Sequence, residues 1–232
     1  MNQMRQSYVI DNDYQLVRHR VLRNTYWLLA LSMIPTILGA WLGVQFNFMG
    51  LFAIHPLLGV VGVIAIILGF RFAIESFKDS GIGVLLMLGY TFFMGLIISG
   101  IIGIALHDFT NGAELITIAF AGTATILGVM ATIGTVSKRD FSGLRQVITV
   151  GLIVTLFGSI LAIVFNMPMF YLLISIAVIG LSSAYILYTV QQVVNGGERN
   201  YITAALQIYM SLLNIFVRLL QFAMLFAGDN RR

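Results

Sequence analysis

Seven long apolar segments, each of roughly twenty residues, follow one another along the chain and are separated by short polar connections. These segments lack the strict alternation of apolar and polar residues that transmembrane β-strands require. Inside lipid, a helix satisfies its backbone hydrogen bonds within one segment. The pattern therefore predicts seven membrane-spanning helices, at residues 26–48, 56–73, 81–106, 113–136, 144–165, 169–194 and 202–226.

The last two predicted helices differ from the others because polar residues recur along them in steps of three, four or seven, which places these residues on one face of each helix. The connection at 195–200 is short, so the two helices should be antiparallel neighbours with their polar faces toward each other. This pair is the candidate functional core. Its polar members are Ser175, Ser182, Tyr185, Thr189 and Gln192 before the turn, and Gln207, Ser211, Asn214, Arg218 and Gln221 after it.

Arg218 is the one charged residue well inside a predicted span. A cation in hydrocarbon costs about 2.5–3.5 kcal/mol on insertion scales, so it needs a partner, water or a route to the interface. Arg218 lies close to the outer end of the last helix, so its side chain could extend outward to the interface, or it could be buried within the polar face.

The composition agrees with an all-α integral membrane protein, because 59% of the residues are hydrophobic and 9% are charged, against about 25% charged in soluble domains. The absence of cysteine excludes disulfides and thiolate ligands. His19, His55 and His107 are far apart and form no zinc motif, so we expect neither a metal nor another cofactor. The net charge of +4 comes from cations in the connections, which favours contact with the bilayer over nucleic acid.

The positions of lysine and arginine predict the orientation, because these residues accumulate on the cytoplasmic side of membrane proteins. They concentrate in residues 1–25 and in three connections, at 71–80, 137–145 and 195–200. The opposite side holds only Arg231 and Arg232. We therefore expect a cytoplasmic tail at 1–25, one seven-helix domain at 26–227 and a short periplasmic tail at 228–232.

Small residues spaced by four, Gly39 with Gly43 and Gly95 with Ser99 and Gly103, favour tight packing between helices over a dimerisation face. An intramembrane serine protease would need a histidine inside a span, and an aspartyl protease would need two carboxylates there. The chain provides neither, so we expect a protein that is not an enzyme. Facing polar helices could also line an ion path, although cation passage usually uses acidic side chains at membrane depth.

Several segments together resemble one family. They are 19–26 (HRVLRNTY), 119–124 (AFAGTA), the connection 138–142 that begins Lys138, Arg139, Asp140, the turn 195–202 with Gly196, Gly197 and Glu198, and 209–217 (YMSLLNIFV). These motifs are similar to the Bax inhibitor-1 family, and most of all to its bacterial inner-membrane members. The resemblance covers nearly the whole chain and implies a seven-helix fold in which the other helices enclose the last one.

The resemblance also implies function. For the bacterial members it implies binding to the membrane-anchored protease FtsH and restraint of its degradation of membrane proteins. For other members it implies a pH-sensitive calcium leak controlled by two aspartates in the last two helices. The positions that match this aspartate pair are Thr189 and Ser211, which cannot share a proton as two carboxylates do. The sequence therefore favours an FtsH modulator, with a calcium or other cation leak channel or transporter as the alternative.

Overall fold

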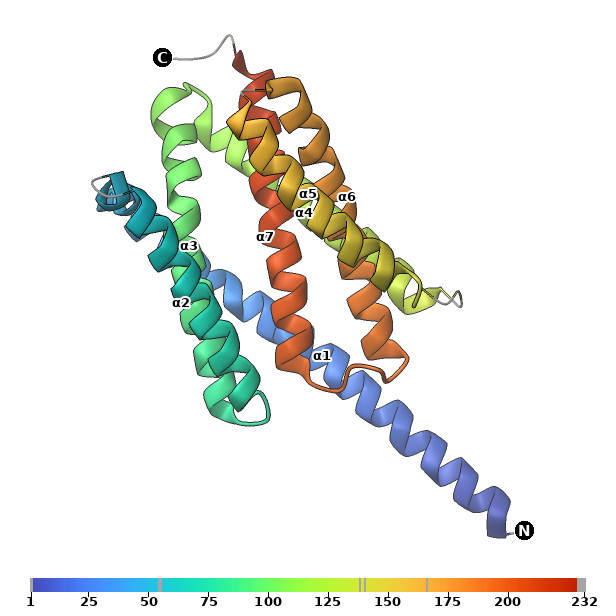
Figure 1. The fold of residues 1–232 in the computed structure, drawn as a ribbon. Helices are drawn as coiled ribbons and strands as arrows, with labels where there is room; N and C mark the ends of the chain where they lie inside the picture. The colour runs from blue at the N-terminus through green and yellow to red at the C-terminus, as the bar shows by residue number, and fades with distance from the viewer. Residues whose placement is uncertain (1, 54–55, 138, 140, 166, 229–232) are drawn as a thin grey trace.

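The computed structural model describes residues 2–53, 56–137, 139, 141–165 and 167–228. The fold is all-α, as the sequence predicts, and the helices follow the order of the apolar segments (Figure 1). They are α1 (Asn2–Gln45), the short 3-10 helix η1 (Phe48–Ala53), α2 (Pro56–Phe77), α3 (Gly81–Asp108), α4 (Gly112–Val136), α5 (Leu144–Val164), α6 (Pro168–Val194) and α7 (Tyr201–Phe226).

Six of the seven predicted helices agree with the structure to within a few residues, but the predicted start of the first helix is wrong. α1 begins at Asn2 rather than near residue 26, and it continues through the polar segment as one helix (Figure 1). Residues 2–25 contain no glycine or proline, so nothing in the chain interrupts the helix there. The apolar part of α1 that is long enough to span a membrane runs from Arg18 to Gln45.

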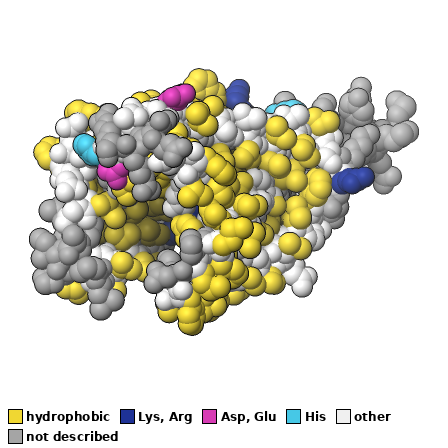
Figure 2. Space-filling model, turned by 90° about the horizontal axis from the view of Figure 1, so that it is seen from above, with side chains coloured by type: hydrophobic (Ala, Val, Ile, Leu, Met, Phe, Trp, Pro, Cys, Tyr) yellow, Lys and Arg dark blue, Asp and Glu magenta, His cyan; other side chains and the backbone are white. Residues whose placement is uncertain are grey.

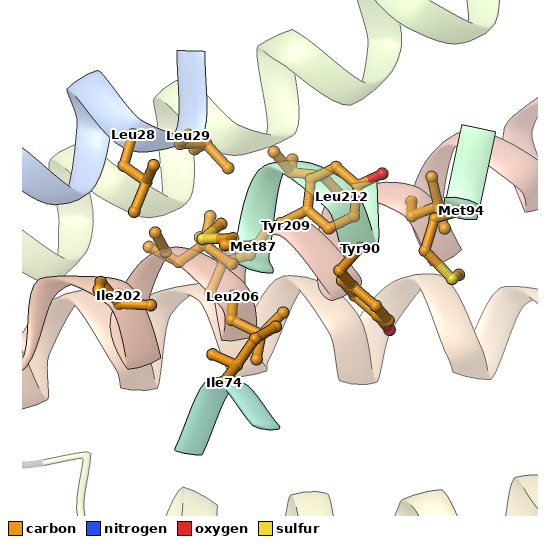
Figure 3. Packing of buried hydrophobic residues seen from close by; sticks show 14 of the residues in the cluster. Leu28, Leu29, Ile74, Met87, Tyr90, Met94, Ile202, Leu206, Tyr209 and Leu212 are labelled. Atoms are coloured by element: carbon orange, nitrogen blue, oxygen red, sulfur yellow. The ribbon is translucent and has the colours of Figure 1, made fainter. Parts of the chain in front are cut away.

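Helix α7 occupies the middle of the bundle and packs against α1, α3, α4 and α6 (Figure 1). Figure 3 shows how apolar side chains from α1, α2 and α3 converge on it. Leu28 of α1, Ile74 of α2 and Met87 of α3 meet Leu206 and other residues of α7 in one buried cluster. The central position of α7 explains why it has more fully buried residues than helices at the edge, such as α2 and α5.

Helices α1 and α3 cross closely because glycines on each helix admit the backbone of the other. A Cβ atom at Gly39 of α1 would collide with the Phe92 carbonyl, and one at Gly95 of α3 would collide with the Thr36 carbonyl. A Cβ atom at Gly43 of α1 would collide with the Ser99 side chain of α3. These small residues therefore serve packing within the chain, as their spacing predicts, except that Gly103 faces open space.

The outer surface of the bundle has the character of a membrane protein. Hydrophobic side chains cover much of the face seen in Figure 2, and charged groups are few among the described side chains on it. Seven of the described helices are long and apolar enough to span a bilayer. Large apolar residues such as Phe72, Val154 and Phe226 are more than 60% exposed, which is stable in contact with lipid and unfavourable in water.

Candidate functional site

The candidate site lies between α6 and α7, which run antiparallel and pack along their lengths. The turn that joins them has a defined conformation at both ends, where α6 stops and α7 starts. Gly196 adopts φ +75°, a left-handed conformation that favours glycine, and closes the end of α6. Asn200 then starts α7, because its side-chain oxygen accepts hydrogen bonds from the Ile202 and Thr203 amides at 2.9 and 3.1 Å.

Thr189 and Ser211, the positions that match the aspartates of other family members, are both buried and both bonded to Gln207. The Thr189 hydroxyl donates to the Gln207 side-chain oxygen at 3.2 Å. The Ser211 hydroxyl donates to the Gln207 backbone carbonyl at 3.0 Å. The Thr189 bond joins α6 to α7, whereas the Ser211 bond lies within α7. Both groups are neutral hydroxyls, so neither places a charge there that pH could switch.

Arg218 forms a second junction between the helices nearer the other end of the bundle. Its guanidinium donates to the Tyr171 hydroxyl at 2.5 Å and to the Gln221 side-chain oxygen at 3.0 Å, with Ser175 at 3.5 Å. It also lies 5.2 Å from the centre of the Tyr171 ring, a cation–π distance. Tyr171 is in the first turn of α6, so the side chain extends toward the helix end and is bonded between the helices. The sequence left two positions open for this side chain, extended to the interface or buried within the polar face, and each describes part of this geometry.

The remaining members of the predicted polar core divide into two groups. Ser182 is buried, Gln192 is half-buried, and Tyr185 is half-buried and stacks on Tyr188 with ring centres 6.4 Å apart. Asn214 does not belong to the enclosed core, because its side chain is exposed on α7. The prediction failed there because spacing places residues on a common side of a helix but does not say which part of that side packs against a neighbour.

The hydrogen bond between Arg218 and Tyr171 should contribute to the stability of the bundle. Replacing Tyr171 by phenylalanine keeps the ring but removes the hydroxyl, and should lower the free energy of unfolding in detergent by about 1 kcal/mol. In a chain that also carries Arg218→Met, the same Tyr171 change should cost less, since the bond to Arg218 is already lost and only the one to Gln221 remains. Thermal unfolding of the four chains measures this coupling. An equal cost in both backgrounds would show that the two side chains are not bonded.

The ends of the helices that carry most of the cations are connected to one another. Asn200 donates from its amide nitrogen to the Lys78 carbonyl and to the Asp79 carboxylate, each at 2.9 Å, which links the α2–α3 and α6–α7 connections. Arg18 of α1 reaches the Asn195 carbonyl at 3.5 Å. Lys78 donates to Glu75, and this hydrogen bond and charge raise the pKa of Lys78, so the cation persists at this end of the bundle.

The other connection residues that the sequence singled out lie at the same end. The Glu198 carboxylate accepts from the Asn200 amide at 2.9 Å, and Gly197 closes onto the Gln192 carbonyl at 2.8 Å. Arg139 is exposed, and its carbonyl accepts a hydrogen bond from Gln191. Lys138, Asp140 and His55 lie outside the described residues.

The sequence did not point to two buried polar residues that join separate parts of the bundle. Gln191 holds the α4–α5 connection, because its side chain donates to the Arg139 carbonyl and accepts from the Phe141 amide at 2.8 Å. Tyr209 joins three helices, since its hydroxyl lies 2.9 Å from that of Thr36 and 3.3 Å from the Thr91 carbonyl. Gln191 is one position away from the predicted polar face, and a tyrosine in an apolar helix has no distinctive pattern.

Gln191→Ala should loosen the α4–α5 connection without unfolding the bundle, because it leaves the Arg139 carbonyl and the Phe141 amide without this partner. We expect trypsin to cleave after Arg139 about three to ten times faster, in line with a loss of about 1 kcal/mol. Gln146→Ala, on the exposed face of α5, provides the control. Equal cleavage rates in the two variants would exclude this role for Gln191.

The site contains hydrogen bonds between neutral groups and those of one arginine, without a carboxylate. Neither α6 nor α7 contains an aspartate or glutamate. Within the described residues, no three histidine, aspartate or glutamate side chains come together as metal ligands would. The fold and this helix pair define a multi-pass α-helical membrane protein whose last two helices are joined by uncharged groups and one arginine.

Comparisons with known proteins agree with this class and specify it. The sequence profile of the family described as "Inhibitor of apoptosis-promoting Bax1" matches residues 18–230. The chain is 33% identical over 215 residues to an uncharacterized protein of Neisseria meningitidis, covering 92% of this chain and 94% of the relative. It is 30% identical over 210 residues to the Escherichia coli K12 protein named "Modulator of FtsH protease YccA", covering 90% and 92%. The same values hold for "Inner membrane protein YccA" of Escherichia coli O6:H1. The chain belongs to the Bax inhibitor-1 family, which confirms the resemblance found in its sequence.

Proposed function

We propose that this chain is a non-catalytic inner-membrane protein that binds an FtsH-type membrane protease and restrains its degradation of membrane proteins. The observation that carries the proposal is the similarity, over nine-tenths of both chains, to a protein named as a modulator of that protease. The positive-inside rule supports a cytoplasmic N-terminus and a periplasmic C-terminus, because the cation-rich connections lie at the N-terminal end of the bundle.

Two structural features support a role in binding rather than transport. The N-terminal part of α1 extends past its membrane-spanning part by about 24 Å, at about 1.5 Å per residue, and can reach a cytoplasmic partner (Figure 1). The described bonds between α6 and α7 involve neutral groups and one cation, which does not favour the passage of cations. A bundle joined in this way should also resist extraction from the membrane.

Co-purification with co-expressed FtsH tests the proposal. The full chain should recover the protease and lengthen the half-life of its membrane substrates, and a chain without residues 2–16 should lose both effects. A chain in which these residues are replaced by the same residues in scrambled order serves as the control for tail length and charge. Failure of the intact chain to recover FtsH or to change substrate half-life would contradict the proposal.

The ion-leak alternative has its own test. Liposomes that contain the purified protein should show no more calcium or proton flux than empty liposomes, at pH 6 or pH 8. Flux that rises with protein content, and that a bulky residue at Thr189 or Ser211 abolishes, would reverse the order of the two functions.

A further inference from the structure

A large apolar groove that the proposed function does not use runs along the bundle between α1 and α4, with residues of α3 and α7 at its base. It encloses about 710 Å³. Its lining on α1 runs from Tyr26 to Gln45, which at about 1.5 Å per residue is about 28 Å, close to the thickness of the hydrocarbon core. Exposed lining residues such as Ile37 and Phe120 show that the groove opens sideways, where the bilayer lies.

The lining of the groove does not suit water. Its threonine hydroxyls are already bonded within their own helices: Thr36 to the Ser32 carbonyl at 2.8 Å, Thr117 to that of Ala113 at 2.8 Å and Thr123 to that of Ala119 at 2.7 Å. Thr36 also pairs with the Tyr209 hydroxyl. A stable bound water needs two to four polar partners, and the remaining lining is almost wholly apolar. The groove therefore favours an apolar occupant.

The dimensions of the groove distinguish between apolar occupants. A helix of about 10 Å diameter would fill 710 Å³ within about 9 Å of its length, so most of a spanning helix would lie outside the groove. Spread over about 28 Å, the same volume gives a cross-section on the order of 25 Å². This matches one hydrocarbon chain, whose carbon atoms contact their neighbours at about 4 Å.

One end of the groove has side chains that can bind the polar part of a lipid. Trp41 and Gln45 lie there, near the C-terminal end of α1, and both are exposed. Tryptophan prefers the level of the lipid headgroups, and its indole N–H and the Gln45 amide can each donate a hydrogen bond to an ester carbonyl. We propose that the groove between α1 and α4 binds one acyl chain of a glycerophospholipid from the leaflet at the α1 C-terminal end, with its ester group at Trp41 and Gln45.

Native mass spectrometry of the protein purified in mild detergent tests this site. The wild-type chain should retain one phospholipid, and Ala124→Phe, which fills the groove from α4, should lower the lipid-bound fraction about tenfold, as a loss of about 1.4 kcal/mol in affinity would do. Ala121→Phe is the matched control, because Ala121 is also exposed on α4 but does not line the groove. It should retain the lipid.

A second variant and a second measurement are needed in case Ala124→Phe fails to fold. Ala30→Phe fills the groove from α1. Phosphatidylethanolamine added to delipidated protein should raise the unfolding temperature of the wild type and of Ala121→Phe, but it should not raise that of Ala30→Phe. A wild-type chain without retained lipid, or equal retention in the groove and control variants, would overturn the proposal. So would a lipid-free dimer that the groove variants dissociate, since a second copy would then be the occupant.

Discussion

Gly95→Ala is expected to lower the free energy of unfolding by about 2 kcal/mol, a large loss for the addition of one methyl group. The new Cβ would collide with the Thr36 carbonyl and lie 2.9 Å from the Ala40 amide nitrogen. Both are backbone atoms of α1, so the contact is relieved only if the two helices move apart. Thermal unfolding in detergent measures the effect.

Other glycines of α1 and α3 provide the control variants for Gly95→Ala. Gly103→Ala on the same helix meets nothing within 4 Å and should leave stability unchanged or slightly increased, because alanine is the better helix former. Gly39→Ala should be as damaging as Gly95→Ala, and the two together should cost less than their sum, since either one separates the same helices. Equal stability of the Gly95 and Gly103 variants would mean that the crossing is looser than described here.

Asn200→Ala should cost about 2 kcal/mol, because one side chain both starts α7 and joins two connections. Removing an N-cap side chain typically costs about 1 kcal/mol, and the hydrogen bonds to Lys78 and Asp79 add about the same. Hydrogen exchange should accelerate at the Ile202 and Thr203 amides, which lose their acceptor. Thermal unfolding and amide exchange together measure both roles.

Two further substitutions separate the roles of Asn200. Asn200→Asp keeps the oxygen that caps α7 but loses the donor and places a second carboxylate beside Asp79, so it should cost at least half as much as the alanine change. Asn195→Ala changes an exposed asparagine of the same turn that uses its backbone carbonyl, and should be near neutral. If Asn195→Ala proved as costly as Asn200→Ala, the effect would belong to the turn as a whole.

Much of the fold was predictable because, in lipid, apolar length alone determines where a helix must be. The same rule explains the error at α1. Polarity before residue 26 marks where the helix leaves the hydrocarbon, and it does not mark where the helix ends. Helix-breaking residues determine where a helix ends, and residues 2–25 contain neither glycine nor proline.

The candidate site was predictable in part. The short connection implied that α6 and α7 would be neighbours. Polar spacing identified Thr189 and Gln207, which are bonded to each other, and Arg218, which is bonded to Tyr171. Spacing alone could not exclude Asn214, because the rotation of a face relative to its neighbours depends on packing. It could not identify Tyr209 either, since its partners lie on α1 and α3, far away in the sequence.

Crosslinking across α6 and α7 tests the central claim, that these helices are joined by uncharged groups and one arginine and form no ion path. The chain has no cysteine, so Thr189→Cys with Gln207→Cys provides one reactive pair. In membranes, a short bifunctional thiol reagent should link this pair within one molecule far faster than Thr189→Cys with Asn214→Cys, and the linked protein should still restrain FtsH. Failure to link the first pair, or a calcium flux that the link abolishes, would contradict the account.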